Sequence, residues 1–209
     1  MNQPSHFDSK YTVTLDALRR TICMCAPGED LVLHETSLTA QYGMSRTPIR
    51  QILQRLAYER LVETRSGVGT MAVPLLEENR ERDLLTHRGI LQAVLLHDLP
   101  DLTIAQQSDI LALAGMASMA GDGTRDRDLQ YDIRNRLHVL LAGLIVDPIL
   151  KDTFSASYWR VVRWDMHDLA TAPDAASDAL RALVGEIAQD RHDSTRELFR
   201  RVLEGEISA

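Results

Sequence analysis

Residues 45–56 read SRTPIRQILQRL and carry the clearest structural signals in the chain. Ser45 is a residue type that commonly caps the start of a helix, and Pro48 falls in the first turn, where its missing N–H costs nothing. Apolar residues then recur at i, i+3, i+4 and i+7, which predicts a helix with one buried stripe made of Ile49, Ile52, Leu53 and Leu56. The side chains off this stripe are expected to face solvent: Arg46, Thr47, Arg50 and Gln54.

The segments on either side complete a small domain. Amphipathic spacing predicts a first helix over 12–24 and a short second helix over 35–42, which Gly43 ends. Two extended runs follow over 61–64 and 70–73, joined by a glycine-rich tip. Three helices and a two-stranded wing form a winged helix-turn-helix, in which the helix after the tight turn enters the major groove of DNA.

The predicted recognition helix and the wing have suitable chemistry for DNA. Arg46 and Arg50 lie one turn apart, and arginine binds guanine O6 and N7 through two hydrogen bonds. Hydroxyl groups suit phosphate oxygens, and glycines let a wing tip approach DNA closely. The candidates are Ser45, Arg46, Thr47, Arg50, Gly67 and Gly69. An exposed arginine face is also ordinary for a solvated helix, and spacing alone leaves that alternative open.

The charge of the chain is unevenly distributed. Its 209 residues carry a net charge of −7, but residues 1–74 hold eight Lys or Arg against seven Asp or Glu, and the remainder holds 15 against 23. We therefore expect only the first third to contact DNA. No apolar run approaches the roughly 18 residues that span a bilayer, and the polar first ten residues do not form a signal peptide. The sequence predicts a cytoplasmic protein without membrane contact, in which Cys23 and Cys25 are free thiols.

Beyond Pro74 the sequence is helical in character throughout. Helices are predicted over 77–97, 101–120, 126–146, 148–169, 175–190 and 193–206, separated by glycine- or proline-containing breaks. Six such helices form a bundle. The predicted fold is mainly α, with a winged helix-turn-helix DNA-binding domain over 1–74 and an all-α helical-bundle domain over 75–209.

Residues 31–73 closely resemble the winged helix of the GntR family of transcription regulators. The resemblance is carried by the segments Ala26–Leu31, Leu38–Thr39, Tyr42–Arg50, Leu53–Leu56, Leu61–Val62 and Gly67–Thr70. In that family, the residues matching Arg46, Thr47 and Arg50, with a wing glycine, contact the operator. Thr36 stands where some relatives have a DNA-contacting arginine, so this contact is expected to be shortened or lost.

The helical half is similar to the FCD effector domain of the FadR subfamily. The similarity rests on 87–92 and on Leu137–Leu150, where the pattern Leu-His-x-x-Leu is followed by Asp-Pro-x-Leu. It implies a homodimer that binds a palindromic double-stranded DNA operator and responds to a small-molecule effector. Most such relatives are repressors that their effector releases from DNA.

Many FCD domains bind a divalent metal through one Asp and three His. In this sequence only His138 matches that set, because Arg134, Leu180 and Val202 occupy the other positions. We therefore predict no metal and no other cofactor. A different alignment register would bring in Asp132, His167 and His192 as ligands instead.

Without a metal, the effector is expected to bind the protein directly. Arg88, Arg134 and His138 are the candidate effector-binding residues, and the two arginines favour an anionic metabolite. His138 is equally compatible with a hydrogen-bonded core histidine, and the arginines with ordinary surface or salt-bridged side chains.

An enzyme and a helical bundle that binds a ligand but not DNA are the two alternatives to a regulator. The sequence has no glycine-rich phosphate loop, nucleophile elbow, paired-carboxylate motif or His-x-x-x-His pair, so it does not predict an enzyme. A ligand-binding bundle whose winged helix no longer binds DNA would not need the intact Arg46 and Arg50 pair. The sequence does not identify the effector, the operator or the sign of the response.

Overall fold

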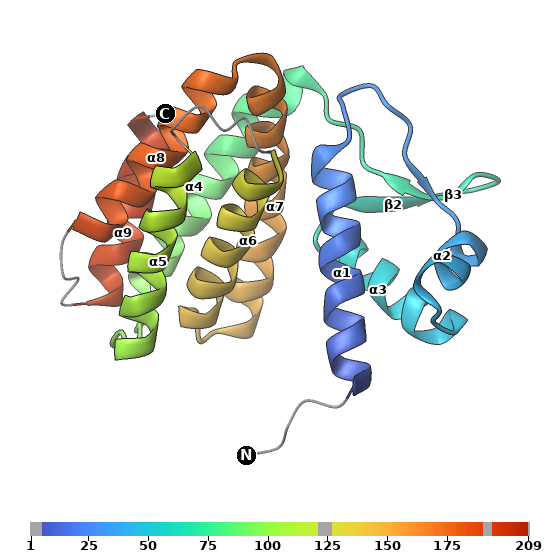
Figure 1. The fold of residues 1–209 in the computed structure, drawn as a ribbon, viewed down its shortest axis with the longest axis horizontal. Helices are drawn as coiled ribbons and strands as arrows, with labels where there is room; N and C mark the ends of the chain where they lie inside the picture. The colour runs from blue at the N-terminus through green and yellow to red at the C-terminus, as the bar shows by residue number, and fades with distance from the viewer. Residues whose placement is uncertain (1–5, 121–126, 190–193, 209) are drawn as a thin grey trace. The chain divides into compact units, whose positions relative to one another are not determined.

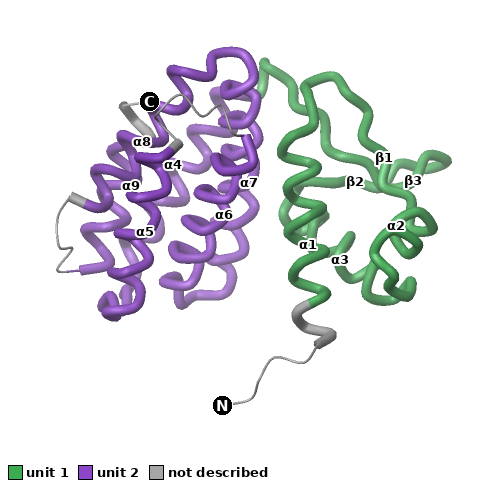
Figure 2. Tube along the Cα trace, in the orientation of Figure 1, with its two compact units in different colours: residues 1–79 green, residues 80–209 purple. Residues whose placement is uncertain are grey.

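The computed structural model describes residues 6–120, 127–189 and 194–208 (Figure 1). It is mainly helical with one small sheet, which confirms the predicted fold class. The chain divides into two compact units, Met1–Asn79 and Arg80–Ala209 (Figure 2). This division falls a few residues after Pro74, where the sequence analysis placed the domain boundary.

The first unit contains three helices and a three-stranded sheet in its described part. The elements are α1 (His6–Met24), β1 (Val32–Leu33), α2 (Glu35–Tyr42), α3 (Arg46–Tyr58), β2 (Val62–Arg65), β3 (Gly69–Ala72) and the 3-10 turn η1 (Glu77–Asn79). Apolar faces of α1 and α3 form most of its core: Leu15, Leu18, Ile22, Ile49, Ile52, Leu53 and Leu56, all buried. The predicted stripe of the third helix is therefore confirmed.

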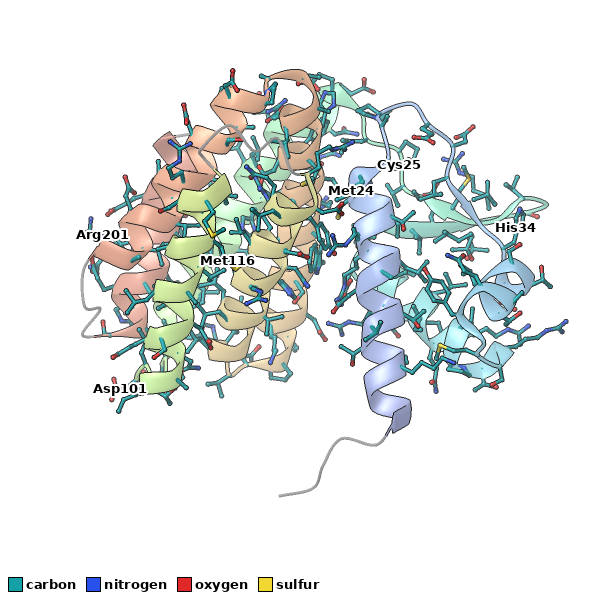
Figure 3. The ribbon with its side chains drawn as sticks, in the orientation of Figure 1. Met24, Cys25, His34, Asp101, Met116 and Arg201 are labelled. Carbon is teal, nitrogen blue, oxygen red and sulfur yellow. The ribbon has the colours of Figure 1, made fainter. Side chains whose placement is uncertain are left out.

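The second helix matches its predicted bounds, and the first is longer than predicted. α1 begins at His6 instead of Thr12, because polar residues at its start weaken the amphipathic pattern on which the prediction rested. From α1, Lys10 Nζ donates to the Gly43 carbonyl at 2.8 Å. At the other end of α1, Cys23 is buried and Cys25, labelled in Figure 3, is half-buried; neither is part of a disulfide.

The wing is a sheet of order β1-β3-β2, with both pairings antiparallel. Thr64 pairs with Thr70, and Arg65 pairs with Gly69 across the tip. The analysis of the sequence predicted the hairpin but not β1, since two residues are too few to show an alternating pattern. β1 adds its pairing through Val32 and Met71 and so extends the sheet by one strand.

The second unit contains six helices in its described part. They are α4 (Arg80–Leu96), α5 (Ile104–Ala120), α6 (Arg127–Leu144), α7 (Pro148–Thr171), α8 (Pro173–Gln189) and α9 (Thr195–Ser208). The long helix α7 packs against α4, α6 and α8, while α9 packs against α4 and α8 (Figure 1). Large aromatic side chains fill the bundle core: Tyr131, Phe154, Trp159, Trp164 and Phe199.

Capping residues explain where several of these helices begin. Thr103 and Gln106 form a reciprocal capping box, so α5 starts at Ile104, later than the predicted Asp101. Asp147 accepts a hydrogen bond from the Leu150 amide at 2.8 Å, which starts α7 at the predicted Pro148. Among the described helices, none is long and apolar enough to cross a membrane.

Candidate nucleic-acid interface and ligand cavity

The turn between α2 and α3 exposes the start of α3. Gly43 ends α2 in the left-handed conformation at φ 56°, which favours glycine. Ser45 is extended and occupies the N-cap position, but its side chain makes no capping hydrogen bond. The first N–H groups of α3 therefore lack a side-chain cap from Ser45, which suits a helix N-terminus that meets a phosphate group.

The predicted DNA-binding side chains of α3 lie together on its exposed side. Ser45, Arg46, Thr47 and Arg50 are all exposed, whereas Pro48 is buried. Arg46 makes no ion pair with any residue that the structure describes. The structure thus places two hydroxyls and two arginines around the first turn of α3, as the spacing predicts.

Arg50 has a partner that the sequence analysis missed. Its Nε lies 3.0 and 2.9 Å from the two carboxylate oxygens of Glu35, the first residue of α2. The Arg50 side chain stays 61% exposed, so the ion pair directs the guanidinium group without burying it. Thr36, next to Glu35, is also exposed. No periodicity in the sequence links α2 to Arg50, so only the fold brings this pair together.

The wing tip depends on its glycines for its backbone conformation. Gly67 has a φ of 79° and Gly69 a φ of 114°, where side chains other than glycine are strained. A Cβ at either position would meet nothing within 4 Å, so the requirement for glycine comes from the backbone and not from crowding. The tip is consequently narrow and exposed, which suits a close approach to DNA.

A buried ion-pair network holds the far end of α3 against α1. Arg19 donates to both oxygens of Glu59, with Nε at 2.7 Å and Nη2 at 2.6 Å. Arg55 donates to the same carboxylate at 2.8 Å, and Asp16 accepts from Arg19 at 2.9 Å. Burial raises the pKa of the Asp16 carboxyl, and the attraction of Arg19 opposes that shift. The network holds the carboxyl end of α3 against α1, and this contact helps to set the orientation of the helix.

A family model described as bacterial regulatory proteins, gntR family, matches residues 11–71. The amino-terminal unit is a GntR-family DNA-binding domain. The match covers most of α1, all of α2 and α3, and nearly all of the wing, and it includes Arg46 and Arg50.

Two solved structures share the fold along nearly the full length of the chain. McbR/YncC from E. coli is 19% identical with a TM-score of 0.58, and the match covers 95% of each chain. A protein described as transcriptional regulator GntR from Rhodococcus sp. RHA1 is also 19% identical, with a TM-score of 0.60 over 96% of this chain and 97% of that chain. No curated protein matches the sequence.

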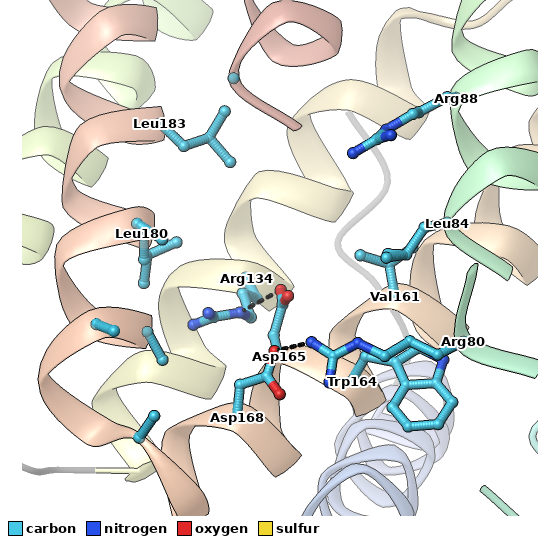
Figure 4. A pocket seen from close by; sticks show the side chains of 15 residues that line it. Arg80, Leu84, Arg88, Arg134, Val161, Trp164, Asp165, Asp168, Leu180 and Leu183 are labelled. Atoms are coloured by element: carbon cyan, nitrogen blue, oxygen red, sulfur yellow. Dashed lines mark hydrogen bonds and ion pairs between the residues drawn. The ribbon is translucent and has the colours of Figure 1, made fainter. Parts of the chain in front are cut away.

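The second unit holds a cavity of about 290 Å³ between its helices (Figure 4). Arg80, Leu84 and Arg88 reach it from α4, and Arg134 reaches it from α6. The remaining walls come from α7, from α8, from Ala172 between these two helices, and from α9. Their lining residues are Val161, Trp164, Asp165, Asp168, Ala172, Ala175, Ala176, Ala179, Leu180, Leu183 and Gly205. The cavity therefore combines apolar walls with a few charged groups, as small-molecule sites commonly do.

Two ion pairs lie in the cavity wall. Arg134 Nε donates to Asp165 Oδ2 at 2.8 Å, and its Nη1 donates to the side-chain oxygen of Gln130 at 2.9 Å. Arg80 pairs with Asp168, and its guanidinium carbon lies 5.4 Å from the centre of the Trp164 ring. Asp165, Asp168 and Trp164 lie on α7, whereas the two arginines lie on α6 and α4, so the sequence does not predict these contacts; Gln130 lies one turn before Arg134 on α6.

The structure brings two of the three predicted effector residues together. Arg88 and Arg134 both line the cavity, but His138 is not among its lining residues. His138 is buried, its Nε2 lies 3.0 Å from Ser155 Oγ, and its ring centre is 4.7 Å from that of Trp159. It therefore occupies the hydrogen-bonded core position that the sequence analysis held open as the alternative.

The positions that the resemblance to FCD domains assigns to metal ligands do not fit a metal in this structure. Arg134 is buried and paired with Asp165, while Leu180 and Val202 are buried apolar side chains. A guanidinium ion repels a divalent cation, and aliphatic groups offer it no ligand atom. Within the described residues, no cluster of three or more His, Cys, Asp or Glu side chains could hold a metal. His192 lies outside the described residues.

Proposed function

We propose that the chain is a ligand-responsive regulator that binds a palindromic DNA operator as a homodimer. The observation that carries the proposal is the exposed pair Arg46 and Arg50 at the start of α3, within the GntR-family domain. Their helix is buried on its opposite side, so both guanidinium groups can reach base edges in a major groove. Ser45 and Thr47 supply phosphate contacts beside them. A single winged helix reads one half-site, and a homodimer supplies the second copy.

The second unit serves as the sensor and dimerisation domain, in keeping with its resemblance to FCD effector domains of the FadR subfamily. A ligand that binds one arrangement of the dimer more tightly shifts the population toward that arrangement. We propose that the favoured arrangement mismatches the half-sites, so that the protein is a repressor that its effector releases. It acts in the cytoplasm, where its DNA target lies.

The effector site is the cavity of the bundle, and it works without a metal. Arg88 reaches into it from α4 (Figure 4), and a guanidinium group is a strong partner for a carboxylate or phosphate. Elemental analysis of protein purified without chelators tests the metal-free site. Stoichiometric zinc, nickel or manganese would contradict it, and sub-stoichiometric traces would support it.

Selection of bound sequences from a genomic DNA pool at near-physiological salt tests the DNA-binding function. We expect a short palindrome to be enriched, with half-sites about one helical turn apart. Each enriched sequence would then be titrated with the dimer to obtain the preference over random DNA. Folded, dimeric protein that enriches no motif would contradict the proposal.

A further inference from the structure

The helices described in the second unit lie in three layers of two. α5 packs against α6 and α8, and α6 also packs against α7. On the other side of α7 and α8, α4 packs against α7 and α9 packs against α8, while α4 and α9 pack against each other. The pairs α5–α6 and α4–α9 are therefore the two outer layers, with α7 and α8 between them (Figure 1).

The two outer layers differ in charge. Exposed positions of α4 and α9 carry many charged side chains: Glu81, Arg82, Arg196, Arg200 and Glu204. In α5, by contrast, Asp109 is the one charged residue among 17. Charged residues make up 25% of the chain, so a helix of this length would carry about four at the average frequency. The outward side of α5 is thus unusually poor in charge for a surface that faces water.

The exposed residues of α5 form one continuous stripe. They recur three or four positions apart along the whole helix: Ile104, Ser108, Leu111, Gly115 and Met119. Ile104 is 83% exposed, Leu111 63% and Met119 69%. The other side of the helix is buried in the bundle through Ile110, Leu113 and Ala117. A helix that is apolar on all sides is normally covered on all sides, so the outward stripe of α5 is expected to be covered as well.

The apolar surface continues from α5 onto α6. Val139, Gly143 and Val146 are exposed at i, i+4 and i+7, and α6 packs against α5. Two adjacent helices of this length cover about 25 Å by 20 Å, or about 500 Å² in projection. A standard interface buries about 800 Å² of accessible surface on each partner, so this face can supply its apolar centre. Asp109 and Arg136 border the face, as polar residues border most protein interfaces.

From these observations we propose that the outward face of α5 and α6 is the surface through which two copies of the chain associate. Each copy carries a net charge of −7, so two copies repel each other least where their surfaces hold no charge. The inference rests on the proposed homodimer, and it adds the surface that joins the two copies.

The stripe of α5 is complementary to itself. Two antiparallel copies of α5 fit around a two-fold axis that passes between Leu111 and Ala112. Large side chains at the centre then face small ones, which allows close packing across an isologous interface. The facing pairs are Leu111 with Ala112, Ser108 with Gly115, and Ile104 with Met119.

Sedimentation equilibrium of the full-length protein tests this surface. We expect the wild type to have twice the 23.5 kDa mass of the chain. Leu111→Asp places two carboxylates beside the two-fold axis and should raise the dissociation constant of the dimer about a hundredfold or more. Leu85→Asp makes the same change at a 56% exposed position of α4, in the other outer layer, and should associate like the wild type. Equal association of the two variants would overturn the proposal.

A mixture of two charge variants tests the two-fold arrangement. Leu111→Lys should also be monomeric on its own, because two ammonium groups would meet at the axis. An equimolar mixture of Leu111→Asp and Leu111→Lys should recover the dimer, since opposite charges then face each other. Recovery also shows that both variants are folded. A mixture that stays monomeric would overturn the arrangement of α5 around the axis.

The same measurements separate this inference from the function on which it rests. A wild type that is monomeric at micromolar concentration, with or without operator, would contradict the homodimer and its surface together. A dimeric wild type with an equally dimeric Leu111→Asp would overturn the surface alone. A monomeric Leu111→Asp that binds the operator with wild-type affinity would support the surface and contradict the proposal that a dimer reads the operator.

Discussion

Glu35 places a negative charge beside the side chain that we expect to read DNA. Both of its oxygens bond Arg50 Nε, which leaves the two terminal nitrogens of the guanidinium group for a base edge. Bidentate recognition of guanine needs those terminal nitrogens in a fixed orientation. We infer that Glu35 is a positioning residue for Arg50.

Glu35→Gln should lower the preference for operator over random DNA by up to about fivefold, since an exposed ion pair contributes about 1 kcal/mol or less. Competition binding with operator and random duplexes gives this ratio. Glu78→Gln removes an exposed negative charge from η1 and should leave the ratio unchanged. A higher ratio in Glu35→Gln would mean that Glu35 competes with DNA for Arg50.

Asp16 predicts a pH effect on stability. Burial raises its pKa above the ordinary value, against the lowering effect of Arg19. A raised pKa means that the folded state favours the protonated form, so this contribution to stability is present at low pH and is lost as the pH rises through the folded-state pKa. Asp16→Asn should therefore slightly stabilise the protein at pH 7, and the gain should shrink below the ordinary pKa of 3.8. Urea unfolding of the variant and the wild type, at pH values from 7 down to below 3.8, measures this difference in stability. A variant that is less stable than the wild type at pH 7 would contradict the expected sign.

At the scale of elements, the placement of α3 depends on a buried charge network. Glu59 is 1% exposed at the end of α3 and accepts from Arg19 of α1 and from Arg55. Removing one member of a buried pair leaves its partner buried without compensation. The network is therefore expected to contribute much more to stability than the exposed pairs of the wing.

Glu59→Gln should lower the free energy of opening of α3 by about 3 kcal/mol. Hydrogen exchange of the α1 and α3 amides measures this locally, which matters because neither tryptophan lies in this unit. Glu63→Gln breaks the exposed pair with Arg65 and should cost less than about 1 kcal/mol. Similar small effects for both substitutions would show that the Arg19 network does not anchor α3.

The sequence predicts those elements whose signals are local. Ser45 as the N-cap and Pro48 in the first turn predict the start of α3, and Gly43 predicts the end of α2. β1 was missed because two residues carry no pattern, and the start of α5 was misplaced because the capping role of Thr103 was overlooked. Local signals also identify Arg46 and Arg50, but they do not reveal Glu35 or the cavity partners Asp165 and Asp168. Those contacts join different helices, so they exist only after the helices pack.

At the scale of the whole molecule, charge separates the two units by role. The first third of the chain is nearly balanced and presents its arginines on α3, while the remainder is strongly acidic. Phosphate groups repel acidic surfaces, so the DNA contact is expected from the first unit alone. The cavity and the aromatic core belong entirely to the second unit. We therefore propose that DNA binding and ligand binding belong to separate units of one chain.

The operator affinity of the double variant Arg46→Ala and Arg50→Ala measures whether α3 reads DNA. Two lost base contacts should weaken binding at least about thirtyfold, since each is worth about 1–3 kcal/mol. The melting temperature should stay nearly unchanged because both side chains are exposed. The double variant Arg82→Ala and Arg136→Ala removes the same charge from exposed positions of the second unit and should bind like the unmodified protein. Wild-type affinity in the α3 variant would contradict the proposal that this helix reads DNA.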